Sequence, residues 1–404
     1  MLDLTKLAQQ MQGISQHLSQ EATATRQRLE LAQRLLQQAQ SRQSELVEQQ
    51  QLWRDRMGFN AAQPIEPLST RIPINPPPTA HTVLATDGSQ IAPSHHEIAY
   101  CYLINVGRII LHYGQNRLPL LDSLPEVFYR AEDLYLSRQW GIGTEEWMGY
   151  RRTVSEATML AELAQAVQAN NSMSDDFASP TIAQPTIALV DGSLIYWFLE
   201  ALPREAREQI LPPILAAWEQ LRQLRIPLVG YLSASRSGES LNFLRLPACP
   251  HPAPDCATYC TGQTDRAPCQ VFDPLRDTSL WAMLLQPGDR SPLWRSSARI
   301  LDDYGAHLVY FCYAHVGAEI ARIEFPAWVA EDADLLNSAL SLTLTQVQKG
   351  YGYPVALAEA HNQAVVRGGD RSRFFALLEQ QMIKAGLRNV GTSYKETRKR
   401  GSIA

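Results

Sequence analysis

The sequence has no long uncharged apolar run, since none reaches the roughly 18 residues that a transmembrane helix needs. Its N-terminus is rich in glutamine and charge and lacks the apolar centre of a secretory signal, so we expect a cytoplasmic protein without membrane contact. Basic residues are not in excess either, because the 404-residue chain has a formal net charge of −5 and a pI near 6.0. A protein that binds nucleic acid over its whole surface is normally basic, so any such contact here must be local.

Proline and glycine are nearly missing from the start of the chain: residues 1–57 contain no proline and one glycine, Gly13. Apolar residues recur there in steps of three and four, which indicates a coiled-coil seam or a helix lying on a core. They are Leu4, Leu7, Met11, Ile14 and Leu18. We expect residues 1–58 to form one long helix or a helical hairpin that packs or dimerises, followed by an extended proline-rich linker at residues 59–80.

Beyond residue 80, short runs rich in β-branched residues mix with helical patterns. Strands are predicted at residues 82–88, 98–106, 108–114, 186–192, 226–233, 307–315 and 319–329, with a hairpin at residues 105–107. Helices are predicted at residues 146–169, 204–223, 333–348, 354–366 and 370–386. This mixture favours an α/β fold with a mixed sheet flanked by helices. Arg322 and Glu324 alternate along the last strand, so they face the same side and are expected to pair.

The tripeptide Asp-Gly-Ser follows a buried-looking apolar run twice, beginning at Asp87 and at Asp191. Both acids are expected at the carboxyl ends of strands, where α/β sheets usually place their sites. Two carboxylates on neighbouring strands repel each other unless a positive charge lies between them, and Mg²⁺ or Mn²⁺ suits an all-oxygen site. Asp-Gly is also a common turn signal, so we expect the chain to turn at each motif, and two independent turns would give the same spacing.

Further ligands would have to come from helices. Glu156 and Glu162 lie six residues apart on the helix predicted at residues 146–169, so only one of them can face a shared site. His361 shares a helical face with Leu357 and Ala364. A histidine on such a face is more often a core residue than a ligand. Beside carboxylates, one imidazole would tilt the preference from Mg²⁺ toward Mn²⁺.

Four segments in this order carry a family resemblance: ATDGSQI (85–91), ALVDGSLI (188–195), ARIEFPAWV (321–329) and GYGYPVALAEAHNQAVV (350–366). The ordered set, which ends with a histidine seven residues after Pro354, resembles the NurA nucleases of DNA double-strand-break repair. The resemblance implies a nuclease domain over residues 81–390 with an RNase H-like core. It also implies Mn²⁺-dependent exonuclease and single-strand endonuclease activity, a homodimer, and partnership with the hexameric translocase HerA.

The resemblance also assigns site residues. Asp87, Asp191 and His361 match the family's two strand acids and its C-terminal histidine, and the intervening helical glutamate falls best on Glu156, with Glu162 in reserve. These four residues would be both the metal ligands and the catalytic residues. Such a site can hold one or two ions that activate water and stabilise the leaving oxygen of a phosphodiester.

Basic residues that could touch DNA phosphates are few and local. Arg236 lies in a loop after a predicted strand, and Arg371 lies beside a Gly-Gly-Asp turn. Residues 391–404 form a basic tail, for which solvated surface charge is the simpler interpretation.

Paired Cys-x-x-Cys motifs are missing, although four of the six cysteines lie close together. These four are Cys249, Cys256, Cys260 and Cys269, within an insert at residues 247–275. A disulfide framework is not expected in a cytoplasmic chain of this size. Four thiols in a proline-rich, core-poor segment favour a structural metal, either Zn²⁺ or an iron–sulfur cluster.

Two other classes of function stay open. One is an ATPase or kinase-like member of the RNase H-type folds, in which strand-end Asp-Gly turns bind Mg-nucleotide. The other is a catalytically inactive scaffold that uses its N-terminal helices to bind partners.

Overall fold

A computed structural model of the chain describes residues 4–94, 99–173, 184–262 and 267–386. The chain forms two compact units, each built from two segments. Unit 1 comprises residues 1–74 and 231–330, and unit 2 comprises residues 75–230 and 331–404. The segment predicted as one nuclease domain, residues 81–390, therefore contributes to both units, and the cysteine-rich insert lies in unit 1. In the described part of the chain, no helix combines the length and the apolar character needed to cross a membrane.

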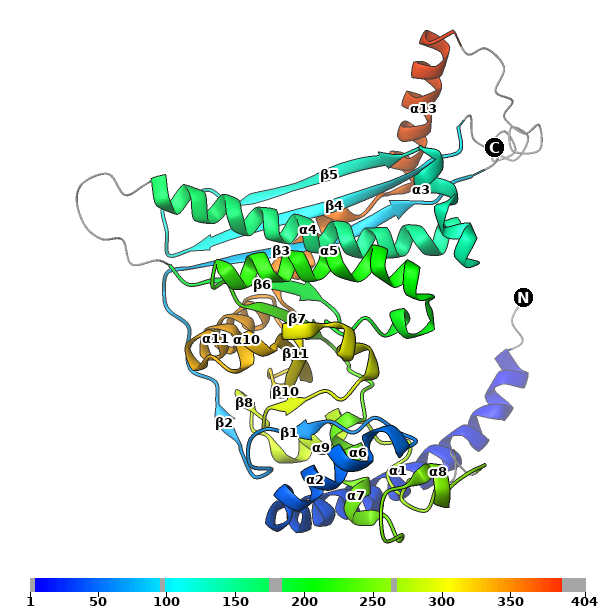
Figure 1. The fold of residues 1–404 in the computed structure, drawn as a ribbon, viewed down its shortest axis with the longest axis vertical. Helices are drawn as coiled ribbons and strands as arrows, with labels where there is room; N and C mark the ends of the chain where they lie inside the picture. Colours follow the sequence, from blue (N-terminus) through cyan, green and yellow to red (C-terminus); the bar gives the residue numbers. More distant parts are fainter. Residues whose placement is uncertain (1–3, 95–98, 174–183, 263–266, 387–404) are drawn as a thin grey trace. The chain divides into compact units, whose positions relative to one another are not determined.

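The sheet of unit 2 is mixed, as predicted. Strand β3 (His81–Ile91) pairs in parallel with β6 (Thr186–Asp191) and antiparallel with β4 (Tyr102–Tyr113). Strand β5 (Leu120–Phe128) forms the far edge, antiparallel to β4, while β7 (Leu228–Leu232) follows β6 and runs into unit 1 (Figure 1). The strand order β7-β6-β3-β4-β5 puts the two Asp-Gly-Ser strands side by side.

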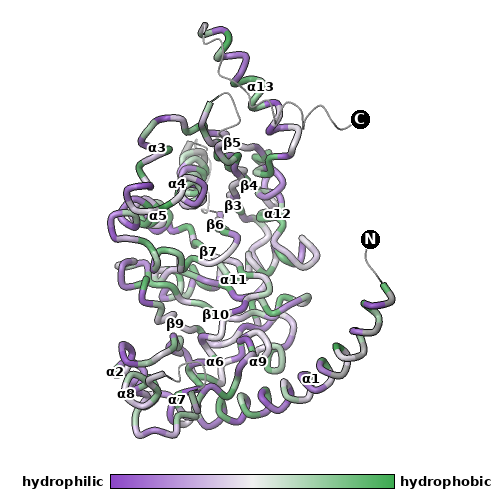
Figure 2. Tube along the Cα trace, turned by 90° about the vertical axis from the view of Figure 1, so that its right-hand side faces the viewer, coloured by the Kyte–Doolittle hydropathy of each residue, from purple (hydrophilic) through white to green (hydrophobic). Residues whose placement is uncertain are grey.

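Helices cover both faces of this sheet. Helix α4 (Thr144–Met173) and helix α12 (Val355–Ala364) contact β3 and β4 from opposite sides (Figure 2). Helix α5 (Arg204–Gln223) packs beside α4, and α11 (Ala333–Lys349) packs against α12. The remaining elements are α3 (Ala131–Tyr135), η2 (Leu136–Trp140), η3 (Trp197–Ala201) and α13 (Gly368–Lys384). The helices predicted at 146–169, 204–223, 333–348, 354–366 and 370–386 correspond to α4, α5, α11, α12 and α13.

Two glycines that were expected at turns lie inside strands instead. The hairpin predicted at residues 105–107 is wrong, because β4 runs straight through Gly107. A Cβ atom at Gly107 would lie 2.7 Å from the backbone nitrogen of Ala364, so the missing side chain lets α12 approach the strand. Gly88 does the same for α4, since a Cβ there would lie 2.6 Å from Cγ of Arg152. Both glycines mark close helix packing.

Unit 1 has a smaller antiparallel sheet. Its strands run in the order β1 (Gln63–Pro64), β9 (Trp294–Arg295), β10 (Val309–His315) and β11 (Ile320–Pro326). Strand β8 (Asp289–Arg290) pairs with β10 and with β2 (Ile72–Pro73). The antiparallel pairing predicted for the two strands at 307–315 and 319–329 is confirmed by β10 and β11. The predicted pairing of Arg322 with Glu324 is also confirmed, with Nε 2.7 Å from Oε1 and both side chains buried.

The N-terminal region is helical, with a break at Arg42 between α1 (Leu4–Ser41) and α2 (Gln43–Trp53). The C-terminal half of α1 packs into the core of unit 1 through Ala32, Leu36 and Ala39. Nearer its start, the same helix leaves Leu4, Met11, Ile14 and Leu18 exposed. The other elements of unit 1 are η1 (Arg54–Arg56), α6 (Glu239–Phe243), α7 (Arg245–Ala248), α8 (Cys256–Tyr259), α9 (Asp277–Leu284), η5 (Arg299–Asp303), η6 (Gly305–His307) and α10 (Ala327–Ala330).

Candidate functional site

Asp87 and Asp191 occupy equivalent places on neighbouring parallel strands. The parallel register of β3 and β6 ends at the pair Thr86 and Val190, and each acid is the next residue along its strand. After Asp191 the chain turns, because β6 ends there and Gly192 has a φ of 108°. After Asp87 it does not turn, because β3 continues to Ile91. The sequence therefore predicted a turn correctly at the second motif and wrongly at the first.

His361 reaches this position from helix α12. Its Nδ1 lies 2.8 Å from Oδ2 of Asp87, and Oδ1 of the same carboxylate accepts a hydrogen bond from the backbone N–H of Gly88 at 2.8 Å. The His361 side chain is 66% exposed, so it is not a core histidine. Both oxygens of Asp87 are thus fixed by neighbours, and the imidazole keeps its other edge toward solvent.

Glu156 reaches the same place from helix α4. The backbone oxygen of Glu156 accepts a hydrogen bond from the Thr86 hydroxyl at 3.0 Å, which ties the helix to β3 one residue before Asp87. Oε1 of Glu156 lies 3.3 Å from Nε of Arg152, one turn earlier on the helix. Glu162 is exposed to solvent and does not line the cavity described below.

The carboxylates disturb one another electrostatically. Burial raises the pKa of Glu156 from an ordinary value of 4.5 to about 7; the charge of Arg152 lowers it, and the charges of Asp87 and Asp191 add to the rise. Loss of solvent, together with the charge of Asp87, raises the pKa of Asp191, while a hydrogen bond from Tyr353 lowers it. The site therefore carries more negative charge than its neighbours compensate.

A cavity of about 300 Å³ opens beside these acids. The cavity is lined by all three carboxylates, by other polar groups, and by apolar and aromatic side chains. The lining residues are Thr86, Asp87, Arg152, Thr153, Glu156, Ala157, Leu160, Val190, Asp191, Ser193, Tyr196, Trp218 and Leu221. A hollow in which a few polar groups converge among apolar side chains is typical of a ligand site.

The donor set fits a hard divalent cation by its chemistry. Three carboxylates and one imidazole are ligands that Mg²⁺ and Mn²⁺ accept, and the charge of Asp87 lies close enough to raise the pKa of both Glu156 and Asp191. As the side chains lie, no three His, Cys, Asp or Glu residues in the described ranges already form a metal-binding group. Closing the site around an ion would therefore need side-chain rotation.

Two residues of the site, Arg152 and Tyr353, were not predicted from the sequence. Arg152 precedes Glu156 by four positions, so helical spacing alone puts both on one face, and this signal was available. Tyr353 stands directly before Pro354 in the segment that carries the family resemblance, but its hydrogen bond to Asp191 depends on how the chain folds.

Neither of the arginines predicted to touch DNA lines the cavity. Arg371 is in the first turn of α13, with its guanidinium 5.5 Å from the centroid of the Phe375 ring. Arg236 is exposed and belongs to unit 1. The predicted basic tail at residues 391–404 lies outside the described residues.

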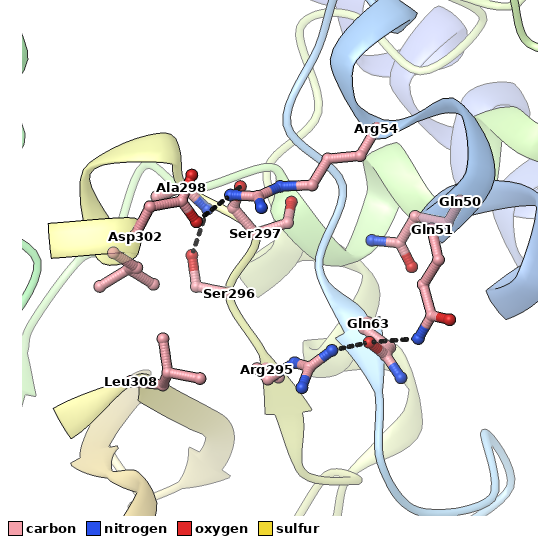
Figure 3. Close-up of a pocket in the computed structure, with 11 residues that line it drawn as sticks. Gln50, Gln51, Arg54, Gln63, Arg295, Ser296, Ser297, Ala298, Asp302 and Leu308 are labelled. Carbon is pink, nitrogen blue, oxygen red and sulfur yellow. Dashed lines mark hydrogen bonds and ion pairs between the residues drawn. The ribbon is translucent and has the colours of Figure 1, made fainter. Parts of the chain in front are cut away.

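Unit 1 has a hollow of its own, of about 220 Å³, between η1 and the segment after β9 (Figure 3). Arg54 pairs with Asp302 across it at 2.9 Å, and Arg295 donates to the side-chain oxygen of Gln63. None of the residues predicted from the sequence to act in catalysis or binding lines this hollow. Gln51 also donates to Gln63, and the hollow contains none of the candidate residues, so the cavity beside the acids is the better candidate site.

Comparison with known proteins agrees with the order of these motifs. The model of the NurA domain matches residues 81–366. The crystal structure of the NurA nuclease from Sulfolobus solfataricus is similar in fold, with 11% identity, a TM-score of 0.51, and coverage of 95% of this chain and 98% of that chain. Comparison with curated proteins gave no match. Because the NurA model spans more than half of the chain, the chain belongs to the NurA family.

Proposed function

We propose that this chain is a metal-dependent nuclease that hydrolyses phosphodiester bonds of DNA, as an exonuclease and as a single-strand endonuclease, in end resection and double-strand-break repair. Membership of the NurA family supports a nuclease that acts in DNA repair. The observation that carries the proposal is the convergence of Asp87, Glu156 and Asp191 on one cavity, with His361 bonded to the first of them.

The same residues would hold the metal ion. Asp87, Glu156 and Asp191 would supply oxygen ligands and His361 a nitrogen ligand to Mn²⁺ or, less favourably, Mg²⁺. When bound, the ion would supply the positive charge that activates water and stabilises the leaving 3′ oxygen.

Neighbouring groups affect the protonation of these proposed ligands. If Nδ1 of His361 donates its proton to Asp87, then Nε2 keeps the lone pair that a ligand nitrogen needs. The hydroxyl of Tyr353 donates to Asp191 and favours its charged form. Arg152 does the same for Glu156 through its charge, so Asp191 and Glu156 each have one neighbour that opposes the rise in their pKa.

The substrate would enter the cavity beside the acids, whose lining includes Tyr196 and Trp218. Both aromatic side chains are largely buried, with 9% and 2% of their surface exposed, so they would bound the cavity rather than stack on bases.

The proposal includes partners. A chain with net charge −5 lacks a general attraction for DNA, so a confined channel or a partner must hold the strand. A second copy of the chain and a hexameric HerA-type ATPase would supply both, as the family resemblance implies. The exposed apolar residues at the start of α1 offer one surface for such contacts.

One experiment separates this function from the alternatives. The purified chain is incubated with single-stranded and duplex DNA, with ATP, and with Mn²⁺, Mg²⁺ or chelator, and both DNA products and phosphate release are measured. A nuclease degrades DNA with Mn²⁺ and not with chelator, and loses this activity in Asp191→Asn. ATP turnover without DNA cleavage would favour the ATPase or kinase-like alternative, and neither activity, with or without the translocase, would favour the scaffold.

A further inference from the structure

The cysteine-rich insert of unit 1 gathers its four thiols at one place. Cys249, Cys256, Cys260 and Cys269 line a single cavity of about 10 Å³, and they pack together around Ala267. Cys260 and Cys269 are 6% and 3% exposed, and all four are free thiols. Residues 20 positions apart in a proline-rich segment would not converge on one point without a reason for the convergence.

Hydrogen-bond donors point at these sulfurs. The backbone N–H of His251 donates to the sulfur of Cys249, and Nη2 of Arg245 lies 3.5 Å from Sγ of Cys269. Neutral thiols are weak acceptors and gain little from such donors, whereas thiolates accept them strongly. Thiolates bound to a metal would therefore find these donors already in place.

Arg245 is a buried cation beside these sulfurs. Its side chain is 9% exposed, its guanidinium lies 3.7 Å from the centroid of the Phe59 ring, and among the described residues its Nε has no hydrogen-bond partner. The hydrogen bonds of Arg245 within the described ranges go to Asn242 and Cys269, and neither is a carboxylate. Thiolate sulfur bound to a metal would place negative charge beside this buried cation.

We propose that Cys249, Cys256, Cys260 and Cys269 bind a single structural Zn²⁺ ion. Zinc takes four thiolates in a tetrahedral site, and its binding deprotonates them. The size of the cavity decides between the two metals that the sequence left open, because about 10 Å³ is the room that one water molecule or one ion needs. A four-iron cluster with its sulfides would not fit without opening the insert.

The thiols do not yet form a metal-binding group as they lie. Rotation about the Cα–Cβ bonds moves a sulfur by ångströms between staggered positions, so the backbone need not move for the site to close. The nearby N–H donors would then hold the charge of the zinc–thiolate group, as partners of metal ligands commonly do.

The site would fasten the insert to the N-terminal region of unit 1. Arg56 of η1 already pairs with Asp255 at 2.8 Å and donates to the Thr258 hydroxyl at 2.8 Å. Asp255 in turn caps α8, the helix that carries Cys256. Zinc bound to Cys256 would hold this small helix from its other side, so loss of the zinc should make the insert less stable.

The test counts zinc in the full chain, purified without oxygen and carrying Asp191→Asn so that the nuclease site does not hold the metal that is counted. We expect about one zinc ion per chain, no visible iron–sulfur absorption, and four thiols that react only after a chelator or denaturant is added. Replacement of zinc by Co²⁺ should give the sulfur-to-cobalt charge-transfer bands of a thiolate site. None of these measurements depends on nuclease activity, so a negative result for zinc would leave the proposed function unaffected.

Variants complete the design. Cys256→Ser with Cys260→Ser should reduce zinc to less than about one fifth of the parent, whereas Cys312→Ala, which removes a buried thiol of β10 in the same unit, should retain it. If the double variant does not fold, the zinc count and the Co²⁺ spectrum of the parent chain still decide. A parent chain without zinc, zinc that persists in the double variant, or an iron–sulfur chromophore would overturn the proposal.

Discussion

Nδ1 of His361 lies 2.8 Å from Oδ2 of Asp87, although 274 positions separate the two residues in the chain. The contact requires that α12 approach β4 closely enough to bring its histidine to the neighbouring strand. Gly107 makes that approach possible. The contact thus joins the two motifs that the sequence offered as separate candidates.

Asp87→Asn should reduce Mn²⁺-dependent DNA degradation by at least about 100-fold, because the proposed metal site would lose a charged ligand. Stability of the metal-free protein should hold or rise, since Asp87 repels Glu156 and Asp191. Initial rates of DNA degradation and thermal unfolding with chelator measure the two effects. Asp334→Asn, an exposed acid on α11, is the control and should leave both unchanged. Near-normal activity of Asp87→Asn would mean that the site is elsewhere.

The pKa of Glu156 predicts a pH-dependent effect on stability. Its folded-state pKa of about 7 exceeds the ordinary value of 4.5, so the folded protein holds this proton more tightly than the unfolded chain. Below about pH 4.5 the side chain is protonated in both the folded and the unfolded state, so it does not affect the free energy of unfolding. As pH rises from about 4.5 through 7, the buried charge lowers the free energy of unfolding, by at most about 3 kcal/mol.

Glu156→Gln removes that buried charge, so with chelator present it should be more stable than the parent at pH 8 and little different at pH 5. Denaturant unfolding of both proteins at the two pH values measures this. Glu162→Gln changes an exposed glutamate on the same helix and should show no such difference. Equal stability of Glu156→Gln and the parent at pH 8 would show that the surroundings do not destabilise the charged carboxylate.

Gly107→Ala should damage the site without touching a proposed ligand. The added methyl group would lie 2.7 Å from the backbone nitrogen of Ala364, so α12 must move and carry His361 with it. We expect a loss of about 1–3 kcal/mol in stability and up to about 100-fold in nuclease rate.

The control is Gly149→Ala on α4, where a Cβ meets nothing within 4 Å. Removing a glycine from a helix interior should stabilise it by roughly 0.5–1 kcal/mol and leave the rate unchanged. If Gly107→Ala behaves like Gly149→Ala, the close approach of α12 is not required.

The apolar residues at the start of α1 predict a dimer contact. Ile14 and Leu18 are 48% and 60% exposed, and with Leu7 they follow the spacing of a coiled-coil seam. Leu7→Glu with Ile14→Glu should shift sedimentation from dimer to monomer and weaken the processing of duplex DNA.

Gln20→Glu with Gln27→Glu adds the same charge on the opposite face of the helix and should leave the dimer intact. A parent chain that sediments as a monomer at tens of micromolar yet degrades duplex DNA fully would contradict the contact.

Much of unit 2 could be predicted from the sequence. Apolar periodicity predicted its long helices and most of its strands, and the repeated Asp-Gly-Ser predicted two acids on adjacent strands. The glycines were the main error, because a glycine that allows a helix to approach a strand looks in sequence like one that turns the chain. Gly88 and Gly107 are both of this kind.

The division into two units could not be predicted. It depends on residues 1–74 packing with residues 231–330, and the apolar pattern of α1 fits many partners. The cavity beside the acids could not be predicted either, because it depends on how side chains from β3, α4, β6 and α5 pack together.

The register between β3 and β6 has a consequence for insertions and deletions. Side chains alternate between the two faces of a sheet, so one residue gained or lost in either strand turns every later side chain to the opposite face. Thr86 and Val190 form the last parallel pair, and such a change before them would send one aspartate to one side of the sheet and leave its partner on the other. The lengths of these two strands should therefore be fixed up to the two aspartates.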